Sequence, residues 1–314
     1  MKRLLPVVVA SLLLWLILRN IDISVVIDAI AAISPGVLLG TAILFLLTCA
    51  LGTTKWRLLW KKAGWWEMLG AGFASLFYSM VLPGQLGGEV AKALRVGITH
   101  NDTAAVSASV ILDKATSLVA LLTLACVGAA LSDSSAAARV STLVAVVAGV
   151  LVCLLCLLMW PPVVKTLICR LESVSIAPGT WSRCVAAFNA FLRAWQQQAQ
   201  RPYILVGAIA LGILYQLLVV SMNVVVAAAL DVRVEFVDWC WILGLIAVAL
   251  LLPITVAGLG VREASYVGLL ALLDVPAERA IAIALLMFAT SLLGAVLGAL
   301  FELVSYARYK SNPA

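Results

Sequence analysis

Residues 252–263 read LPITVAGLGVRE, and residues 82–89 read LPGQLGGE. Each stretch follows an apolar run, begins with leucine and proline, and passes through small residues and glycines to a glutamate. Proline lacks a backbone N–H and glycine costs backbone entropy, so each stretch is expected to break a helix. Two such breaks in one chain therefore decide how the segments around them are arranged.

The composition indicates a membrane protein. Of 314 residues, 64% are hydrophobic and 11% are charged, whereas soluble domains carry about 25% charged residues. The mean hydropathy is +1.14. These values exclude an ordinary soluble enzyme, a disordered protein and a nucleic-acid reader. The net charge of +6 comes from basic residues beside apolar runs, as in cytoplasmic membrane loops. We expect an all-α polytopic membrane protein.

Six apolar segments are predicted to be full transmembrane helices, which need roughly 17–25 residues. The first follows Lys2 and Arg3, and it lacks a cleavage site, so we expect an uncleaved span. The six are 4–18, 36–54, 103–131, 140–160, 203–230 and 280–304.

The segments 68–98 and 239–273, which contain the two breaks, are predicted to be re-entrant. With both termini in the cytoplasm, this arrangement places most Lys and Arg residues on the cytoplasmic side, as the positive-inside rule requires. The basic residues left outside are Arg19, Arg139, Arg233 and Arg279. Making either broken segment a full span would put a basic loop on the wrong side.

The order of segments predicts an inverted repeat within a single transmembrane domain, 1–314. Residues 1–135 form the first repeat and residues 136–314 the second, each with one re-entrant segment. Residues 161–202, amphipathic from 163 to 200, form a cytoplasmic or interfacial connector. Inverted repeats with broken helices are the architecture of many secondary transporters.

Both breaks are followed by charged residues. A charge at mid-membrane costs about 2.5–3.5 kcal/mol on insertion scales, so it survives by pairing or by facing water. Helix starts near Gly88 and Arg262 would present free N–H groups to a phosphate or carboxylate. The alternative is a pair of kinked packing helices whose charges pair for structural reasons.

The pairing of these charges has several solutions. Lys92 is three residues after Glu89, so the two can pair on one helix face. Lys114 could pair with Glu89 or Glu263, and Asp113 could pair with Arg262 or Arg95. Separately, the stretch from Lys55 to Lys62 mixes tryptophan with cations, which favours an interfacial anchor.

No catalytic or cofactor motif is present. The sequence has one histidine and no phosphate-binding loop, so catalytic-serine and metal constellations cannot be assembled. We expect no enzyme activity, no cofactor and no metal.

The sequence resembles the transmembrane region of lysylphosphatidylglycerol synthases, a flippase-like family that includes the membrane half of the bacterial multiple peptide resistance factor. The matching marks are LPG at 82–84 with GGE at 87–89 and Lys92, LDK at 112–114, and GLGVRE at 258–263 with Pro253. The family often has aspartate and arginines where this chain has Glu89, Lys92 and Lys114. Lysine, unlike arginine, cannot bind a phosphate through two parallel hydrogen bonds. We expect a stand-alone member without the synthase domain.

The resemblance implies movement of a lipid between leaflets of a bacterial or archaeal inner membrane. The implied substrates are phosphate-headgroup lipids: anionic or aminoacylated phospholipids, or polyprenyl or hopanoid-type lipids. The implied partners are membrane lipids and a separate lipid-modifying enzyme, with no nucleic acid; the sequence leaves the oligomeric state open. The candidate substrate-binding residues are Pro83, Gly84, Gln85, Gly87, Gly88, Glu89, Lys92, Arg95, Asp113, Lys114, Pro253, Gly258, Gly260, Arg262 and Glu263.

Two other functions remain open. One is an intramembrane enzyme acting on a polyprenyl-phosphate lipid, with Glu89 or Asp113 as the acid or base. The other is a non-transporting scaffold for lipid-synthesis enzymes.

Overall fold

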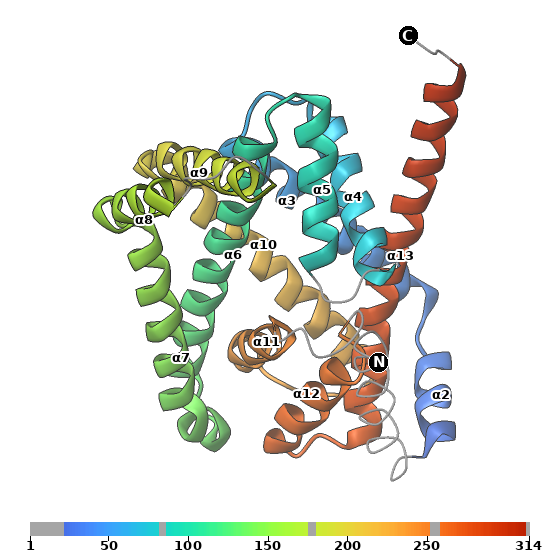
Figure 1. The fold of residues 1–314 in the computed structure, drawn as a ribbon. Coiled ribbons are helices and arrows are strands. Elements are labelled where there is room, and N and C mark those ends of the chain that lie inside the picture. The colour runs from blue at the N-terminus through green and yellow to red at the C-terminus, as the bar shows by residue number, and fades with distance from the viewer. Residues whose placement is uncertain (1–21, 82–85, 175–179, 252–257, 312–314) are drawn as a thin grey trace.

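The computed structural model describes residues 22–81, 86–174, 180–251 and 258–311, and these residues form helices and short turns with no strand (Figure 1). The helices are α2 (Ile23–Ala31), α3 (Pro35–Leu59), α4 (Trp65–Val81), α5 (Leu86–Thr99), α6 (Thr103–Leu131), α7 (Ser135–Met159), α8 (Pro161–Val174), α9 (Thr180–Ala199), α10 (Pro202–Ala229), α11 (Phe236–Leu251), α12 (Val261–Leu270), the 3₁₀ helix η1 (Ala271–Leu273) and α13 (Ala277–Ser311).

Five of these helices are long and apolar enough to cross a membrane: α3, α6, α7, α10 and α13. They coincide with five of the six predicted spans, including 103–131 to the residue. Proline at the first position starts α3 and α10, where its missing N–H has no intrahelical partner to lose. The predicted first span, 4–18, lies outside the described residues.

Each broken segment forms two shorter helices. The first gives α4 and α5, which pack against each other, and the second gives α11 and α12. The breaks themselves, 82–85 and 252–257, lie outside the described residues. Figure 1 shows the α4–α5 pair and the α11–α12 pair at opposite ends of the molecule. We call these the α9 end, where α8 and α9 also lie, and the α2 end.

Each helix pair packs against the long helix that follows the other pair. Helix α4 packs on α13, whereas α11 packs on α6, and α5 and α12 each pack on the long helix that follows them. Glycines allow the backbones to approach closely. A Cβ atom at Gly298 would lie 2.1 Å from the Phe73 carbonyl oxygen, and one at Gly128 would lie 2.6 Å from that of Val237.

The predicted connector, 161–202, contains two amphipathic helices, α8 and α9, and not one. The interruption contains Pro178 and Gly179, within residues 175–179 that lie outside the described part. Helix α9 packs on α6, where the buried Trp195 joins Leu59 and Ala108 in one apolar cluster.

Candidate functional site

The predicted site residues that the structure describes come from three helices and one turn. Gly87, Gly88, Glu89, Lys92 and Arg95 lie on α5. Asp113 and Lys114 lie on α6, Gly258 and Gly260 lie in the turn before α12, and Arg262 and Glu263 lie in the first turn of α12. Pro83, Gly84, Gln85 and Pro253 lie outside the described residues.

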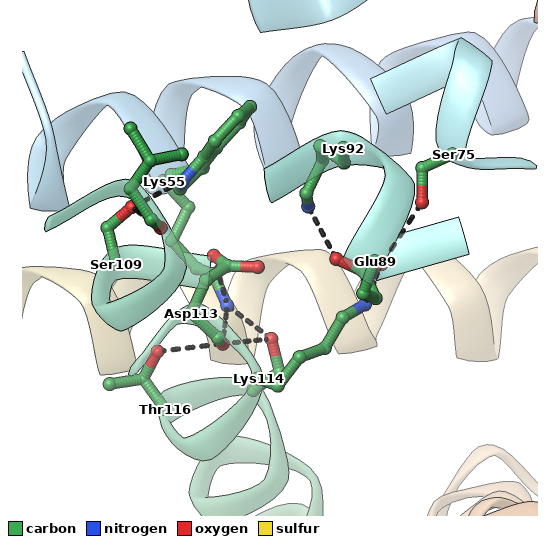
Figure 2. Close-up of polar contacts among 11 residues, drawn as sticks. Lys55, Ser75, Glu89, Lys92, Ser109, Asp113, Lys114 and Thr116 are labelled. Atoms are coloured by element: carbon green, nitrogen blue, oxygen red, sulfur yellow. Dashed lines mark hydrogen bonds and ion pairs between the residues drawn. The ribbon is translucent and has the colours of Figure 1, made fainter. Parts of the chain in front are cut away.

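Glu89 is the centre of an ion-pair cluster between α4, α5 and α6. Its carboxylate oxygens lie 2.7 Å from Lys92 Nζ and 2.9 Å from Lys114 Nζ (Figure 2). The Ser75 hydroxyl of α4 donates to the same carboxylate at 3.4 Å. The predicted pairing of Glu89 with Lys92 is confirmed, and of the two partners offered for Lys114, Glu89 or Glu263, the structure has Glu89.

A close approach of α4 and α5 places Ser75 beside Glu89. A Cβ atom at Gly88 would lie 2.1 Å from the Ser75 carbonyl oxygen, so only glycine fits there without moving one helix. Glycine at this position therefore fixes how far α5 stands from α4, and with it the position of the next residue, Glu89.

Asp113 pairs with a residue that the sequence interpretation assigned elsewhere. Lys55 Nζ lies 3.1 Å from Asp113 Oδ1, and it donates to the Asp113 carbonyl oxygen at 2.8 Å and to the Ser117 hydroxyl. The suggested pairing of Asp113 with Arg262 or Arg95 is wrong. Lys55 and Trp56 are both 2% exposed within the protein, so these two residues are not part of an interfacial anchor.

Trp56, the residue after Lys55, contacts α6 and Lys92 of the Glu89 cluster. Its indole N–H donates to the Ser109 hydroxyl at 3.0 Å, and Lys92 Nζ lies 4.6 Å from its ring centre. A cation over an indole face is stabilised by the ring quadrupole. Lys92 is therefore held both by Glu89 and by the ring.

Arg95 faces away from this cluster. Its guanidinium pairs with Glu302 on α13, donates to the Ser305 hydroxyl at 3.2 Å and lies 5.0 Å from the Phe301 ring centre. It does not line the cavities described below. Arg95 therefore fastens α5 to α13.

The turn before α12 is built on two glycines with positive φ. Gly258 has φ of 74° and Gly260 has φ of 83°, angles that other residues rarely adopt. The Gly260 N–H donates to Glu263 Oε2 at 2.6 Å, so this 2%-exposed carboxylate caps the start of α12. Glu263 therefore stabilises the start of α12.

Arg262, in the first turn of α12, borders two of the cavities described below. Its guanidinium carbon lies 5.3 Å from the Phe288 ring centre, and its buried Nη1 makes no hydrogen bond to the described part of the protein. A buried guanidinium nitrogen without a partner has donor capacity left for a ligand.

Three cavities lined by described residues adjoin this site. The largest, 290 Å³, borders Lys55, Lys92, Asp113 and Lys114. A second, 210 Å³, borders Glu89, Lys114 and Arg262, and a third, 230 Å³, borders Arg262 together with Asn223 and Tyr266. The Lys114 side chain is 52% exposed because it borders the first two.

The balance of charge at the cavities is positive. Among the described residues, four cations border them, Lys55, Lys92, Lys114 and Arg262, but only two carboxylates do, Asp113 and Glu89. Both carboxylates already have lysine partners. The site is thus suited to an anion, because its described carboxylates are already occupied by the protein's own cations.

The sequence contained one signal for Lys55. Thr41, Thr48 and Lys55 recur every seven residues along α3, and Gly52 falls on the same face. Lys55 in this stripe pairs with Asp113 of α6, and Gly52 lies against Tyr215 of α10. Two other cavity residues, Tyr215 and Gln216, lie in an apolar helix with no periodic signal to single them out.

The fold and the buried ion pairs define a multi-pass helical membrane protein with a polar interior. The chain belongs to the family described as Lysylphosphatidylglycerol synthase TM region, whose model matches residues 3–298. The resemblance carried by the three motifs is therefore confirmed. Comparisons with curated proteins and with solved structures found no match.

Proposed function

We propose that this protein moves a phosphate-headgroup lipid between the two leaflets of a bacterial or archaeal cell membrane, without chemically changing it. One observation carries the proposal. Lys114 on α6 and Arg262 on α12 come from different halves of the chain, yet both border the 210 Å³ cavity. Glu89 is the only carboxylate among the described residues there, and Lys92 shares it. A phosphate would restore neutrality.

The proposed membrane arrangement has six spans, two re-entrant helix pairs and both termini in the cytoplasm. The packing supports an inverted repeat, because exchanging α3, α4, α5 and α6 with α10, α11, α12 and α13 reproduces the main contacts, including that of α3 with α10. In this arrangement the α9 end faces the cytoplasm. The α4–α5 pair enters from there and the α11–α12 pair enters from outside.

The proposed mechanism follows from the cost of burying charge. A lipid phosphate crossing the hydrocarbon core alone would lose its hydration, whereas buried cations and donors replace that hydration. Lys114 and Arg262 would hold the phosphate in turn from the two sides, while the acyl chains stay in lipid. A separate lipid-modifying enzyme would supply the substrate.

The test is leaflet exchange in proteoliposomes, with headgroup-labelled anionic phospholipid and polyprenyl phosphate offered separately. We expect the wild-type protein to exchange one of them. Arg262→Ala should slow this exchange about 10-fold to 100-fold, because charge-assisted hydrogen bonds contribute roughly 1.5–3 kcal/mol. Arg139→Ala is the matched control, since Arg139 is exposed on α7 away from the cavities.

Two results would contradict the proposal. The first is no exchange of either lipid by well-folded protein. The second is conversion of the labelled lipid to a new product, which would favour the intramembrane enzyme.

A further inference from the structure

Two residues of α10, Tyr215 and Gln216, border two of the three cavities. Both border the 290 Å³ cavity toward the α9 end and the 230 Å³ cavity toward the α2 end. Lys114 borders the first of these cavities and Arg262 borders the second, so a headgroup that moves between them by way of these two cavities would pass both side chains. Neither is among the motifs that identify the family.

Both side chains have unused hydrogen-bonding capacity. Within the described part of the chain, neither the Tyr215 hydroxyl nor the Gln216 amide makes a hydrogen bond, although both residues are half-buried. By contrast, the nearby Asn223 amide donates to the Val219 carbonyl and accepts from Tyr266. Polar groups beside a cavity that have no partner in the protein are available to hydrogen-bond a polar ligand there.

The unpaired donors and acceptors at the cavities limit which chemical groups the ligand can carry. Lys114 and Arg262 offer only donors, which a phosphate can accept. Gln216 offers a carbonyl oxygen as well, and this acceptor needs a donor that a phosphodiester does not have. An ammonium group would be such a donor, but four cations border the cavities and both described carboxylates there are paired. A hydroxyl group can both donate and accept, and it carries no charge.

We infer that the cavities bind an anionic headgroup that carries hydroxyl groups beside its phosphate, with Tyr215 and Gln216 as its specificity-determining residues. This inference rests on the proposed function, because it assigns the headgroup class to the same site. It favours glycerol-like or sugar-like phosphate headgroups over aminoacylated ones. Lys114 and Arg262 hold the phosphate, and the α10 pair binds the hydroxyls.

The experiment compares two soluble phosphate monoesters on the purified full chain in detergent. Glycerol 1-phosphate and propyl phosphate have the same charge and the same chain length, and they differ by two hydroxyl groups. Binding is measured by titration calorimetry and by the rise in unfolding temperature. We expect the wild-type protein to bind glycerol 1-phosphate about tenfold more tightly, because polar groups built to meet a hydroxyl reject an analogue that lacks it.

Two variants test whether the preference for glycerol 1-phosphate depends on the α10 residues. Gln216→Leu and Tyr215→Phe should each bring the affinity for glycerol 1-phosphate down toward that for propyl phosphate, which itself should change less than about twofold. Arg262→Ala should weaken the binding of both phosphates to the same extent. The controls are Gln197→Leu on the exposed face of α9 and Tyr203→Phe at the exposed start of α10, and both should keep the preference.

Equal affinity of the two phosphates for the wild-type protein would overturn the inference, and so would binding of neither. A preference that survives in both α10 variants would overturn the role of Tyr215 and Gln216. The leaflet-exchange assay judges the proposed function independently. Exchange without a hydroxyl preference overturns only this inference, and a hydroxyl preference without exchange overturns only the translocation.

Discussion

Lys55 on α3 and Asp113 on α6 form a buried ion pair, with 3.1 Å between Nζ and Oδ1 and side-chain exposures of 3% and 10%. The same ammonium also binds the Asp113 carbonyl oxygen and the Ser117 hydroxyl, so it meets α6 at three points. The pair fixes α3 against α6. It also occupies Asp113, so Lys114, the next residue, pairs with Glu89 instead and borders two of the cavities.

Removing Lys55 should be costly. We expect Lys55→Met to lower the free energy of unfolding by about 3–5 kcal/mol, because it leaves the Asp113 carboxylate buried without its partner. The measurement is denaturant or thermal unfolding in detergent. The double variant Lys55→Met/Asp113→Asn should recover part of this loss.

Lys62→Met is the control for that measurement. Lys62 pairs with Asp102 at 2.6 Å, but its side chain is 65% exposed, so we expect a loss of at most about 1 kcal/mol. Equal losses of unfolding free energy in the Lys55 and Lys62 variants would show that the buried pair stabilises the protein no more than the exposed pair does.

Gly88→Ala should separate α4 from α5. The added methyl group would lie 2.1 Å from the Ser75 carbonyl oxygen, a backbone atom that cannot turn aside. We expect a loss of about 1–3 kcal/mol of stability, as for overpacking in a core. Gly149→Ala on α7 meets nothing within 4 Å and should be neutral or stabilising. Unchanged stability in Gly88→Ala would mean that the α4–α5 contact is loose.

Asp238→Ala should destabilise the α2 end. Asp238 is 5% exposed, and its Oδ1 accepts from the Ser132 hydroxyl at 2.6 Å, the Ser134 hydroxyl at 3.0 Å and the Trp241 indole N–H at 2.8 Å. Losing this acceptor leaves buried donors unsatisfied, at a cost of about 2–3 kcal/mol. Unfolding measurements check this, with the exposed Asp133→Ala as the control. Similar values for both variants would argue against the network.

Glu89→Gln should strengthen anion binding. The change removes the one described carboxylate bordering the cavity of Lys114 and Arg262, so the charge there rises by one. A negative charge several Å from a bound phosphate weakens its binding by about 1 kcal/mol, at an effective dielectric constant near 20 and with partial screening by solvent. We expect glycerol 1-phosphate to bind roughly threefold to tenfold more tightly at low salt.

The exposed Glu235→Gln is the control for charge. Weaker binding in Glu89→Gln, with an unchanged unfolding temperature, would instead mean that Glu89 holds the two lysines in the geometry the anion needs.

The local features of the chain follow from its amino-acid sequence. Apolar runs of sufficient length predicted α3, α6, α7, α10 and α13, because a membrane span is set by length and composition. Proline and glycine predicted the interruptions of both broken segments. The pairing of Glu89 with Lys92 was also predictable, because residues three apart on a helix are neighbours.

The long-range pairings came only from the tertiary structure. Asp113 pairs with Lys55, and Arg95 pairs with Glu302, although the sequence offered Arg262 or Arg95 for Asp113. Helices that are apolar on most faces show no strong periodicity, so their sequence does not set which face meets which neighbour. That choice depends on close backbone contacts such as the one at Gly298. The sequence by itself thus determined the helices and their charges, while helix packing decided which charges pair with one another and which side chains, such as those of Lys114 and Arg262, border the cavities.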